Sequence, residues 1–180
     1  YNLIYSETFK FELLLKIKIV NVVATANLNQ PIHLGKVGNL NGVFYDFNKY
    51  RCAYFTHKDM YCKVSVFKTG KMISIGTNKL ENAEHDIKFV TRKLLDTGQI
   101  KPVKIMIKVR NIVASADMGA LFRLEEIASS LKSIIYEPEQ FPGVIWHPKD
   151  FKISILIFSS GKLVIAGLKT MGEYSQLSLF

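Results

Sequence analysis

The stretch Phe67–Gly76, FKTGKMISIG, occurs again 91 residues later as Phe158–Gly167, FSSGKLVIAG. A second repeated stretch lies upstream of each copy. Asn21–Asn27 (NVVATAN) matches Asn111–Asp117 (NIVASAD) at a spacing of 90 residues. Two matches at almost the same spacing indicate an internal duplication, so the chain consists of two similar halves.

A third match lies between the other two. Tyr45–Tyr50 (YDFNKY) aligns with Tyr136–Phe141 (YEPEQF), again 91 residues apart. Three matches in register predict an approximate twofold axis within one molecule. A protein with that symmetry suits a ligand that shares it, and duplex DNA is the commonest such ligand.

Composition narrows the class of partner. The chain has 180 residues, enough for a substantial core, and a net charge of +9 from 24 Lys and Arg against 15 Asp and Glu. This charge favours a polyanion such as nucleic acid or an acidic membrane surface. Three lysines and one glutamate interrupt the apolar run over residues 9–23, so we expect neither a membrane span nor a signal peptide there.

The sequence shows no pattern typical of a catalytic or metal site. Cys52 and Cys62 lack metal-ligand spacing and are expected to be free thiols in a reducing compartment. No nucleophile–base motif accompanies the histidines, which are scattered along the chain. We therefore expect no cofactor, no metal and no enzymatic activity. The histidines are His33, His57, His85 and His147.

Hydrophobic periodicity predicts the elements. An apolar stripe at helical spacing predicts a helix over 80–97 with Gly98 as its C-cap, and short helices are expected after the first strand of each half. A closing helix near Thr170 would be short, frayed or missing. Alternation of β-branched and polar residues predicts strands at 18–28, 51–56, 61–67 and 72–77, and at 104–115, 143–146, 152–158 and 163–168.

The order of these elements predicts an α+β fold. Two five-stranded antiparallel units joined edge to edge would form one curved sheet, a pseudo-twofold saddle with helices on its convex face. Residues 1–17 would be an N-terminal extension, 18–103 the first repeat and 104–180 the second. The other face of the sheet must then meet a partner.

The repeated motifs resemble those of the TATA-binding protein core domain family. The residues that carry the resemblance are N-[IV]-V-A at the start of each repeat, Tyr136–Gly143 (YEPEQFPG) and Ile157–Val164 (IFSSGKLV). The resemblance covers about residues 18–170 and is closer in the second repeat. It implies a general transcription initiation factor that binds A/T-rich promoter DNA in the minor groove through the concave face. Kinking of that DNA is an established property of the family.

By position, the resemblance implies four aromatic wedges: Tyr50 and Phe67 in the first repeat, Phe141 and Phe158 in the second. A flat ring can replace a base as a stacking neighbour where the duplex is kinked. Ordinary packing in a β-rich chain is the alternative, but matched repeat positions favour wedges.

Asn21 and Asn111 would lie near the twofold axis, where their amides can donate to minor-groove acceptors; a cap or turn role is the alternative. Lys71 and Lys162 are expected to contact phosphates or to be solvated at hairpin tips. Guanine would bury its amine against an apolar floor, which favours A·T pairs. That floor would comprise Val23, Ile73, Ile75, Val113, Leu156, Val164 and Ala166.

Departures from the family pattern predict lopsided binding. Ile75 and Ala166 replace threonines that usually accompany the asparagines, while Thr56 and His147 replace basic residues at strand ends. Of these two, His147 is still expected to contact DNA.

The first repeat departs further than the second. It has Ser65 where the second has the apolar Leu156, and its first wedge is Tyr50 instead of Phe. We therefore expect the second repeat to be the stronger half.

The resemblance also implies protein partners. Glu137 and Glu139 fall in the loop that family members use to contact transcription factor IIB, with a solvated loop as the alternative. The resemblance supports a contact with factor IIA less strongly, because Asp46–Lys49 matches the corresponding loop of the family poorly. TATA-binding-protein-associated factors are further expected partners. A related bridging factor with weak or altered DNA specificity is the alternative function. Basic charge and motif pattern favour a nuclear, eukaryotic setting over an archaeal one.

Overall fold

Residues 17–177 are described by the computed structural model, and within them ten strands and four helices follow one another. The first half contains β1 (Lys18–Asn27), α1 (Leu34–Val37), β2 (Val43–Phe44), β3 (Cys52–Phe55), β4 (Lys63–Phe67), β5 (Lys71–Thr77) and α2 (Leu80–Asp96). The second half contains β6 (Lys108–Asp117), α3 (Leu124–Ser130), β7 (Ile134–Ile135), β8 (Gly143–Trp146), β9 (Ser154–Phe158), β10 (Lys162–Leu168) and α4 (Met171–Gln176).

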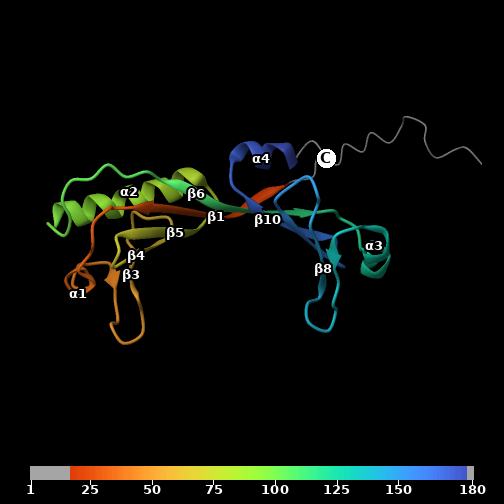
Figure 1. The fold of residues 1–180 in the computed structure, drawn as a ribbon, viewed down its shortest axis with the longest axis horizontal. Helices are drawn as coiled ribbons and strands as arrows, with labels where there is room; N and C mark the ends of the chain where they lie inside the picture. The colour runs from red at the N-terminus through yellow and green to blue at the C-terminus, as the bar shows by residue number, and fades with distance from the viewer. Residues whose placement is uncertain (1–16, 178–180) are drawn as a thin grey trace, which may run out of the picture.

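All ten strands form one antiparallel sheet in the order β2-β3-β4-β5-β1-β6-β10-β9-β8-β7. Each half contributes five neighbouring strands, and the two halves meet where β1 pairs with β6. Figure 1 shows α2 and α4 on one side of the sheet, while the loops joining β2 to β3 and β7 to β8 project from the other side. The expected α+β saddle with helices on its convex face is confirmed.

The twofold axis of the duplication passes through the β1–β6 pair. Val22 pairs with Ile112, the residue that occupies its own position in the other repeat. Where two antiparallel strands are related by a twofold axis, a residue can face its equivalent only on that axis. The flanking pairs, Asn21 with Val113 and Val23 with Asn111, exchange under the same rotation.

The main hydrophobic core lies between the sheet and α2. Alternate residues of β1 and β6 point to this side because side chains on a strand alternate between its two faces. Burying one Ile, Val or Leu side chain contributes about 1.5–3 kcal/mol, so the apolar stripe of α2 is a large part of what fixes the helix to the sheet. The stripe consists of Ala83, Ile87, Val90 and Leu94, which belong to one buried cluster with Val22 and Ala24 of β1 and Ile112 and Ala114 of β6.

The closing helix of the second repeat is short but well defined. Thr170 caps α4: its hydroxyl accepts the Glu173 N–H at 3.0 Å, and the Glu173 carboxylate accepts the Thr170 N–H at 3.2 Å. The hydroxyl of Tyr174 donates to the Ile17 carbonyl at 2.8 Å, which fixes α4 to the start of β1. Of the predicted outcomes for this helix, the short form is the one found.

A glycine at each hairpin tip explains the repeated Gly-Lys pair. Gly70 and Gly161 both have φ of +83°, and a Cβ there would lie 2.2 Å from the Gln30 carbonyl oxygen and 2.0 Å from that of Ala120. Only glycine fits such a conformation and approach. The hairpin tips thereby dock under the loops that follow β1 and β6, and the following lysine begins β5 or β10.

The observed strands differ from the predicted ones at several ends, mostly by one or two residues, and two strands were not predicted. The first strand of the second repeat begins at Lys108 instead of residue 104, because residues 104–107 do not pair with β1. Strand β4 begins at Lys63 instead of residue 61, because the N–H groups of the two preceding residues bind a carboxylate. The two-residue strands β2 and β7 were not located individually, since two residues are too few to show a period.

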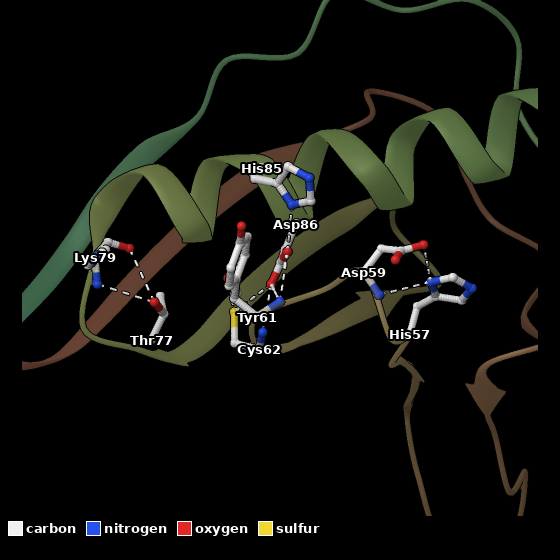
Figure 2. Close-up of polar contacts among 9 residues, drawn as sticks. His57, Asp59, Tyr61, Cys62, Thr77, Lys79, His85 and Asp86 are labelled. Atoms are coloured by element: carbon white, nitrogen blue, oxygen red, sulfur yellow. Dashed lines mark hydrogen bonds and ion pairs between the residues drawn. The ribbon is translucent and has the colours of Figure 1, made fainter.

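That carboxylate belongs to Asp86, which is fully buried at the junction of α2 with β4. Its oxygens accept the N–H groups of Tyr61 and Cys62, at 3.0 and 2.7 Å, and the Cys62 thiol at 3.0 Å. His85 Nδ1 lies 3.0 Å from the other oxygen (Figure 2). Because a buried carboxylate is costly unless it is hydrogen-bonded, this cluster fixes the register of α2 over the sheet.

The Cys62 thiol belongs to this cluster and is held protonated. Partial burial is the main reason that its pKa is raised to about 11, and the Asp86 carboxylate adds to the shift against an opposing hydrogen bond from Ser74. A raised pKa in the folded state means that the unfolded chain ionises first. The thiol therefore contributes its full stability below about pH 9, and that contribution falls as the pH rises towards about 11.

We expect Cys62→Ser to remove this alkaline loss of stability. Serine keeps a donor for Asp86 and does not ionise in this range. Melting temperatures of both proteins measured from pH 8 to 11 should show the advantage of the wild type shrinking as the pH rises. A constant difference between the two curves over that range would contradict the assignment.

Candidate nucleic-acid interface

One face of the sheet is not covered by helices (Figure 1). The strands that form it are poor in acidic residues. Asp117, the last residue of β6, is the only acidic residue in the ten described strands. Apolar side chains on this face remain partly exposed; Ile75, for example, is 46% exposed. A large, partly exposed apolar surface in a basic protein indicates a binding surface.

The residues predicted to form the floor and the centre of the site are brought together on this face by strand alternation. Each of them neighbours a buried residue of the opposite face, as Val23 neighbours Val22 and Val164 neighbours Ile165. The floor and centre comprise Asn21, Val23, Ile73, Ile75, Asn111, Val113, Leu156, Val164 and Ala166, with Phe67 and Phe158 at the ends of their strands.

The two central asparagines are held in equivalent orientations. Asn21 Oδ1 accepts the N–H of Gly76 at 3.2 Å, and Asn111 Oδ1 accepts the N–H of Gly167 at 2.9 Å. Each bond uses the oxygen of the side-chain amide, so the NH₂ group is left as the donor. The asparagines are therefore neither helix caps nor turn residues, and they present two donors on either side of the axis.

Cross-strand neighbours show how the floor differs between the halves. Ser65 pairs with Tyr54 and Ile73, whereas its counterpart Leu156 pairs with Ile145 and Val164. The second half therefore presents an unbroken apolar surface at this point. The first half contains a hydroxyl and a phenol in the same place.

In the second repeat, the two predicted wedges contact each other. The rings of Phe141 and Phe158 lie 5.8 Å apart in an edge-to-face arrangement. Gly143 makes the contact possible, because a Cβ at this residue would lie 3.0 Å from the Phe141 ring and 3.3 Å from the Phe158 ring. The pair is thus formed by contacts within the chain.

In the first repeat, the corresponding ring packs elsewhere. Tyr50 contacts Phe44 at 5.8 Å and Tyr54 at 5.4 Å, and within residues 17–177 it makes no ring contact with Phe67. The residue equivalent to Gly143 is Cys52, which pairs with Phe67 and puts a side chain where the second repeat has none. A hydrogen bond with Cys52 is also the main cause of a raised pKa for Tyr54.

Basic side chains border the first-repeat part of this face. Besides the predicted Lys71, they include Lys104, Lys108 and Arg110, which line a hollow of about 910 Å³ together with Phe67. Sequence reasoning missed these three. Their signal in the sequence was the alternation over 104–110, where Ile105, Ile107 and Val109 are separated by residues that are mostly basic.

The remaining predicted contacts lie at strand ends. Lys162, the counterpart of Lys71, is exposed at the start of β10. His147 follows β8 and is exposed, and its Nδ1 lies 3.1 Å from the Ser154 hydroxyl. Thr56 occupies the equivalent place in the first repeat and is also exposed.

The two glutamates predicted to bind a protein partner lie in the loop between β7 and β8. Both Glu137 and Glu139 are exposed, and the Glu137 carbonyl accepts two N–H groups that close the loop. Next to it, the Tyr136 hydroxyl donates to Glu125 of α3 at 2.9 Å. The pKa of Glu125 is lowered, first by its own N–H at the start of α3 and then by Tyr136, whose own pKa Glu125 raises.

Cys62, Asp86 and His85 lie together but do not form an activated nucleophile. The thiol donates to Asp86 rather than to His85, and its raised pKa is the opposite of what a reactive cysteine needs. Among residues 17–177, no three His, Cys, Asp or Glu side chains are grouped so that they could hold a metal ion. No helix in this part of the chain has the length and apolar character to cross a membrane.

Comparison with known proteins identifies the family. The model of the family described as transcription factor TFIID, or TATA-binding protein, matches this chain twice, over residues 16–97 and 106–178. A TATA-box-binding protein from Methanosphaera stadtmanae is 35% identical, covering 88% of this chain and 87% of the relative. One from Cenarchaeum symbiosum is 36% identical and covers 89% of each chain.

A solved structure agrees with these relatives. The fold matches that of Methanococcus jannaschii TBP with a TM-score of 0.77 and 34% identity, over 89% of this chain and 93% of the other. Each repeat is matched by the family model separately, in agreement with the duplication. The chain therefore belongs to the TATA-binding protein family, whose members are DNA-binding factors of transcription initiation.

Proposed function

We propose that this protein binds A/T-rich promoter DNA in the minor groove through its helix-free sheet face, kinks it with aromatic side chains and recruits other initiation factors. The single observation that carries the proposal is the pair of central asparagines. They offer NH₂ donors on either side of the twofold axis above an apolar floor. Such a floor disfavours guanine, whose exocyclic amine would be buried without an acceptor.

The wedges would act unequally in this proposal. Phe141 and Phe158 are already paired, so little conformational entropy is lost when they enter a base step. Tyr50 must first leave Phe44 and Tyr54 to reach the same arrangement with Phe67. The second repeat would therefore contribute more stacking energy than the first.

Phe158→Ala should weaken binding to an A/T-rich duplex by about 1–3 kcal/mol, the scale of one base–aromatic stack, and Phe67→Ala by less. Bending measured by fluorescence transfer between dyes at the duplex ends should fall in the same order. Gly143→Cys, which gives the second repeat the side chain of the first, should also reduce bending. Equal losses from both phenylalanine variants would contradict this inequality.

Asn111→Asp tests the central donors. The carboxylate can still accept the Gly167 N–H, so we expect the melting temperature to change little, but the donor is lost and a negative charge faces the groove. Affinity for an A/T-rich duplex, measured by anisotropy titration, should fall at least tenfold, or about 1.4 kcal/mol. Asn21→Asp should have a similar effect.

Asn78→Asp is the matched control for these asparagine variants. Asn78 is exposed just before α2, so the same change of charge is made away from the sheet face. Its affinity should equal that of the wild type. A central variant that binds as well as this control would show that the asparagines do not contact the groove.

The proposal includes protein partners. Glu137 and Glu139 would contact transcription factor IIB, and residues 46–49 in the matching loop of the first repeat would contact factor IIA. Both glutamates are exposed and unpaired within residues 17–177, in a loop on the side of the sheet opposite α2 and α4 (Figure 1). TATA-binding-protein-associated factors complete the proposed set. The protein would act where chromosomal DNA is, in the nucleus of a nucleated cell.

Reversing both charges, with Glu137→Lys and Glu139→Lys, should abolish the complex with factor IIB on promoter DNA in a gel-mobility assay. Binding of DNA alone should be retained. Glu81→Lys with Glu126→Lys, on α2 and α3, changes the same net charge elsewhere and should leave the complex intact. A factor IIB complex that survives the first pair would remove this loop from the proposal.

A bridging factor with weak DNA specificity is the second candidate, favoured by the missing threonines at Ile75 and Ala166. Titration of A/T-rich and G/C-rich duplexes at several salt concentrations separates the two. A preference for A/T with a modest salt slope supports the initiation factor. A steep slope without sequence preference supports the bridging factor.

A further inference from the structure

The stretch 101–110 is hydrogen-bonded to the first repeat at both ends, through Lys101 and through Arg110. Between these two anchors it separates from β1. The Gln30 amide donates to the Lys101 carbonyl at 3.0 Å and accepts the Lys101 N–H at 2.9 Å. Arg110 Nε donates to the Thr25 hydroxyl at 2.9 Å. Pairing with β1 begins only at Lys108, and the hollow of about 910 Å³ lies between these anchors.

This segment turns its charged side chains into the hollow. Val103, Ile105 and Ile107 pack against the main core, so the alternate residues face outwards. Among these outward-facing residues, Lys104, Lys108 and Arg110 are cations. Lys71, at the start of β5, lines the same hollow. No carboxylate lines the hollow, and none of the four cations has an ion-pair partner within residues 17–177.

The hollow is continuous with the proposed DNA-binding face. Phe67 and Ile73, predicted as wedge and floor, also line it. A duplex on that face would therefore pass beside the four cations. Cations that lie close together without ion-pair partners create a positive local potential, and a bound anion neutralises it. The phosphodiester backbone supplies anions at regular spacing along such a path.

The other half of the molecule lacks two of these charges. At the repeat spacing of 90 residues, Lys108 corresponds to Lys18, but Arg110 corresponds to Val20 and Lys104 to Leu14, which lies outside the described residues. Arg110 and Val20 are both the extra residue of a β-bulge in the β1–β6 pair. The two repeats therefore differ in charge at a position next to the twofold axis, although the pairing of β1 with β6 is the same on both sides of it.

We propose that Lys104 and Arg110 form a phosphate-binding wall on the first-repeat side only, which contacts the backbone of the bound duplex. This inference rests on the proposed function and extends it. The first repeat, with the weaker wedge pair, holds DNA by charge, and the second repeat holds it by stacking. Thr25 orients the guanidinium through Nε and leaves both terminal nitrogens for a phosphate, a geometry that suits bidentate contact.

The test converts the first-repeat side to the composition of the second. Lys104→Leu and Arg110→Val introduce the residues that the chain itself has at the equivalent positions. Each lost phosphate contact lowers the slope of log K against log salt by about 0.9, so the double variant should lose about 1.8. Hydroxyl-radical footprints should lose protection on one side of the site only.

Two controls make the result specific. Arg110→Lys keeps the charge and should keep the slope, which separates lost contacts from a damaged sheet. Lys88→Leu removes one charge from α2, on the opposite side of the sheet, and should leave the slope unchanged. Melting temperatures verify that every variant is folded.

The outcomes separate this inference from the proposed function. A double variant with the wild-type slope and footprint overturns the wall, while A/T preference in both proteins leaves the proposed function standing. If the wild type shows no A/T preference, the proposed function fails, and the wall fails with it as a promoter contact. The proposal would also be overturned if the hollow binds an acidic peptide and the double variant does not change the slope of log K against log salt for DNA.

Discussion

The antiparallel pairing of β1 with β6 is the constraint on which the rest of the structure depends. It joins two five-stranded units into one sheet, and the equivalent residues Val22 and Ile112 face each other on its axis. That arrangement places both asparagines at the centre of the sheet and the predicted wedges Phe67 and Phe158 farther out, on β4 and β9. A shift by one residue would turn every side chain of a strand to the other face, so the pairing fixes the whole floor at once.

Backbone symmetry and chemical asymmetry coexist because they reside in different parts of the molecule. The hairpin glycines, Gly70 and Gly161, and the asparagine bonds to Gly76 and Gly167 are the same in both halves. The halves differ in the length of the closing helix, 17 residues in α2 and six in α4, and within the sheet they differ in side chains. Cys52, at the position equivalent to Gly143, is one such change, because it puts a side chain where the second repeat leaves room for the contact between Phe141 and Phe158.

Most of the fold could be predicted from the sequence because the duplication supplies two samples of each element. Strand alternation and the α2 stripe are local signals, and both repeats agree on them. The asparagines and the floor follow from the same register. The contacts that could not be predicted join residues far apart in sequence, such as Arg110 with Thr25, Gln30 with Lys101 and Asp86 with Cys62. Periodicity contains no information on such pairs.

The bulges at Val20 and Arg110 have a consequence for how such a molecule can diverge. Every other residue in the central strand pair has a ladder partner, so its replacement disturbs a neighbour across the sheet. A bulged residue has no ladder partner directly opposite, so a change in its size or charge disturbs the strand pairing less. In the central strand pair, the most constrained part of the sheet, each repeat therefore has one position at which its sequence can diverge from that of the other repeat.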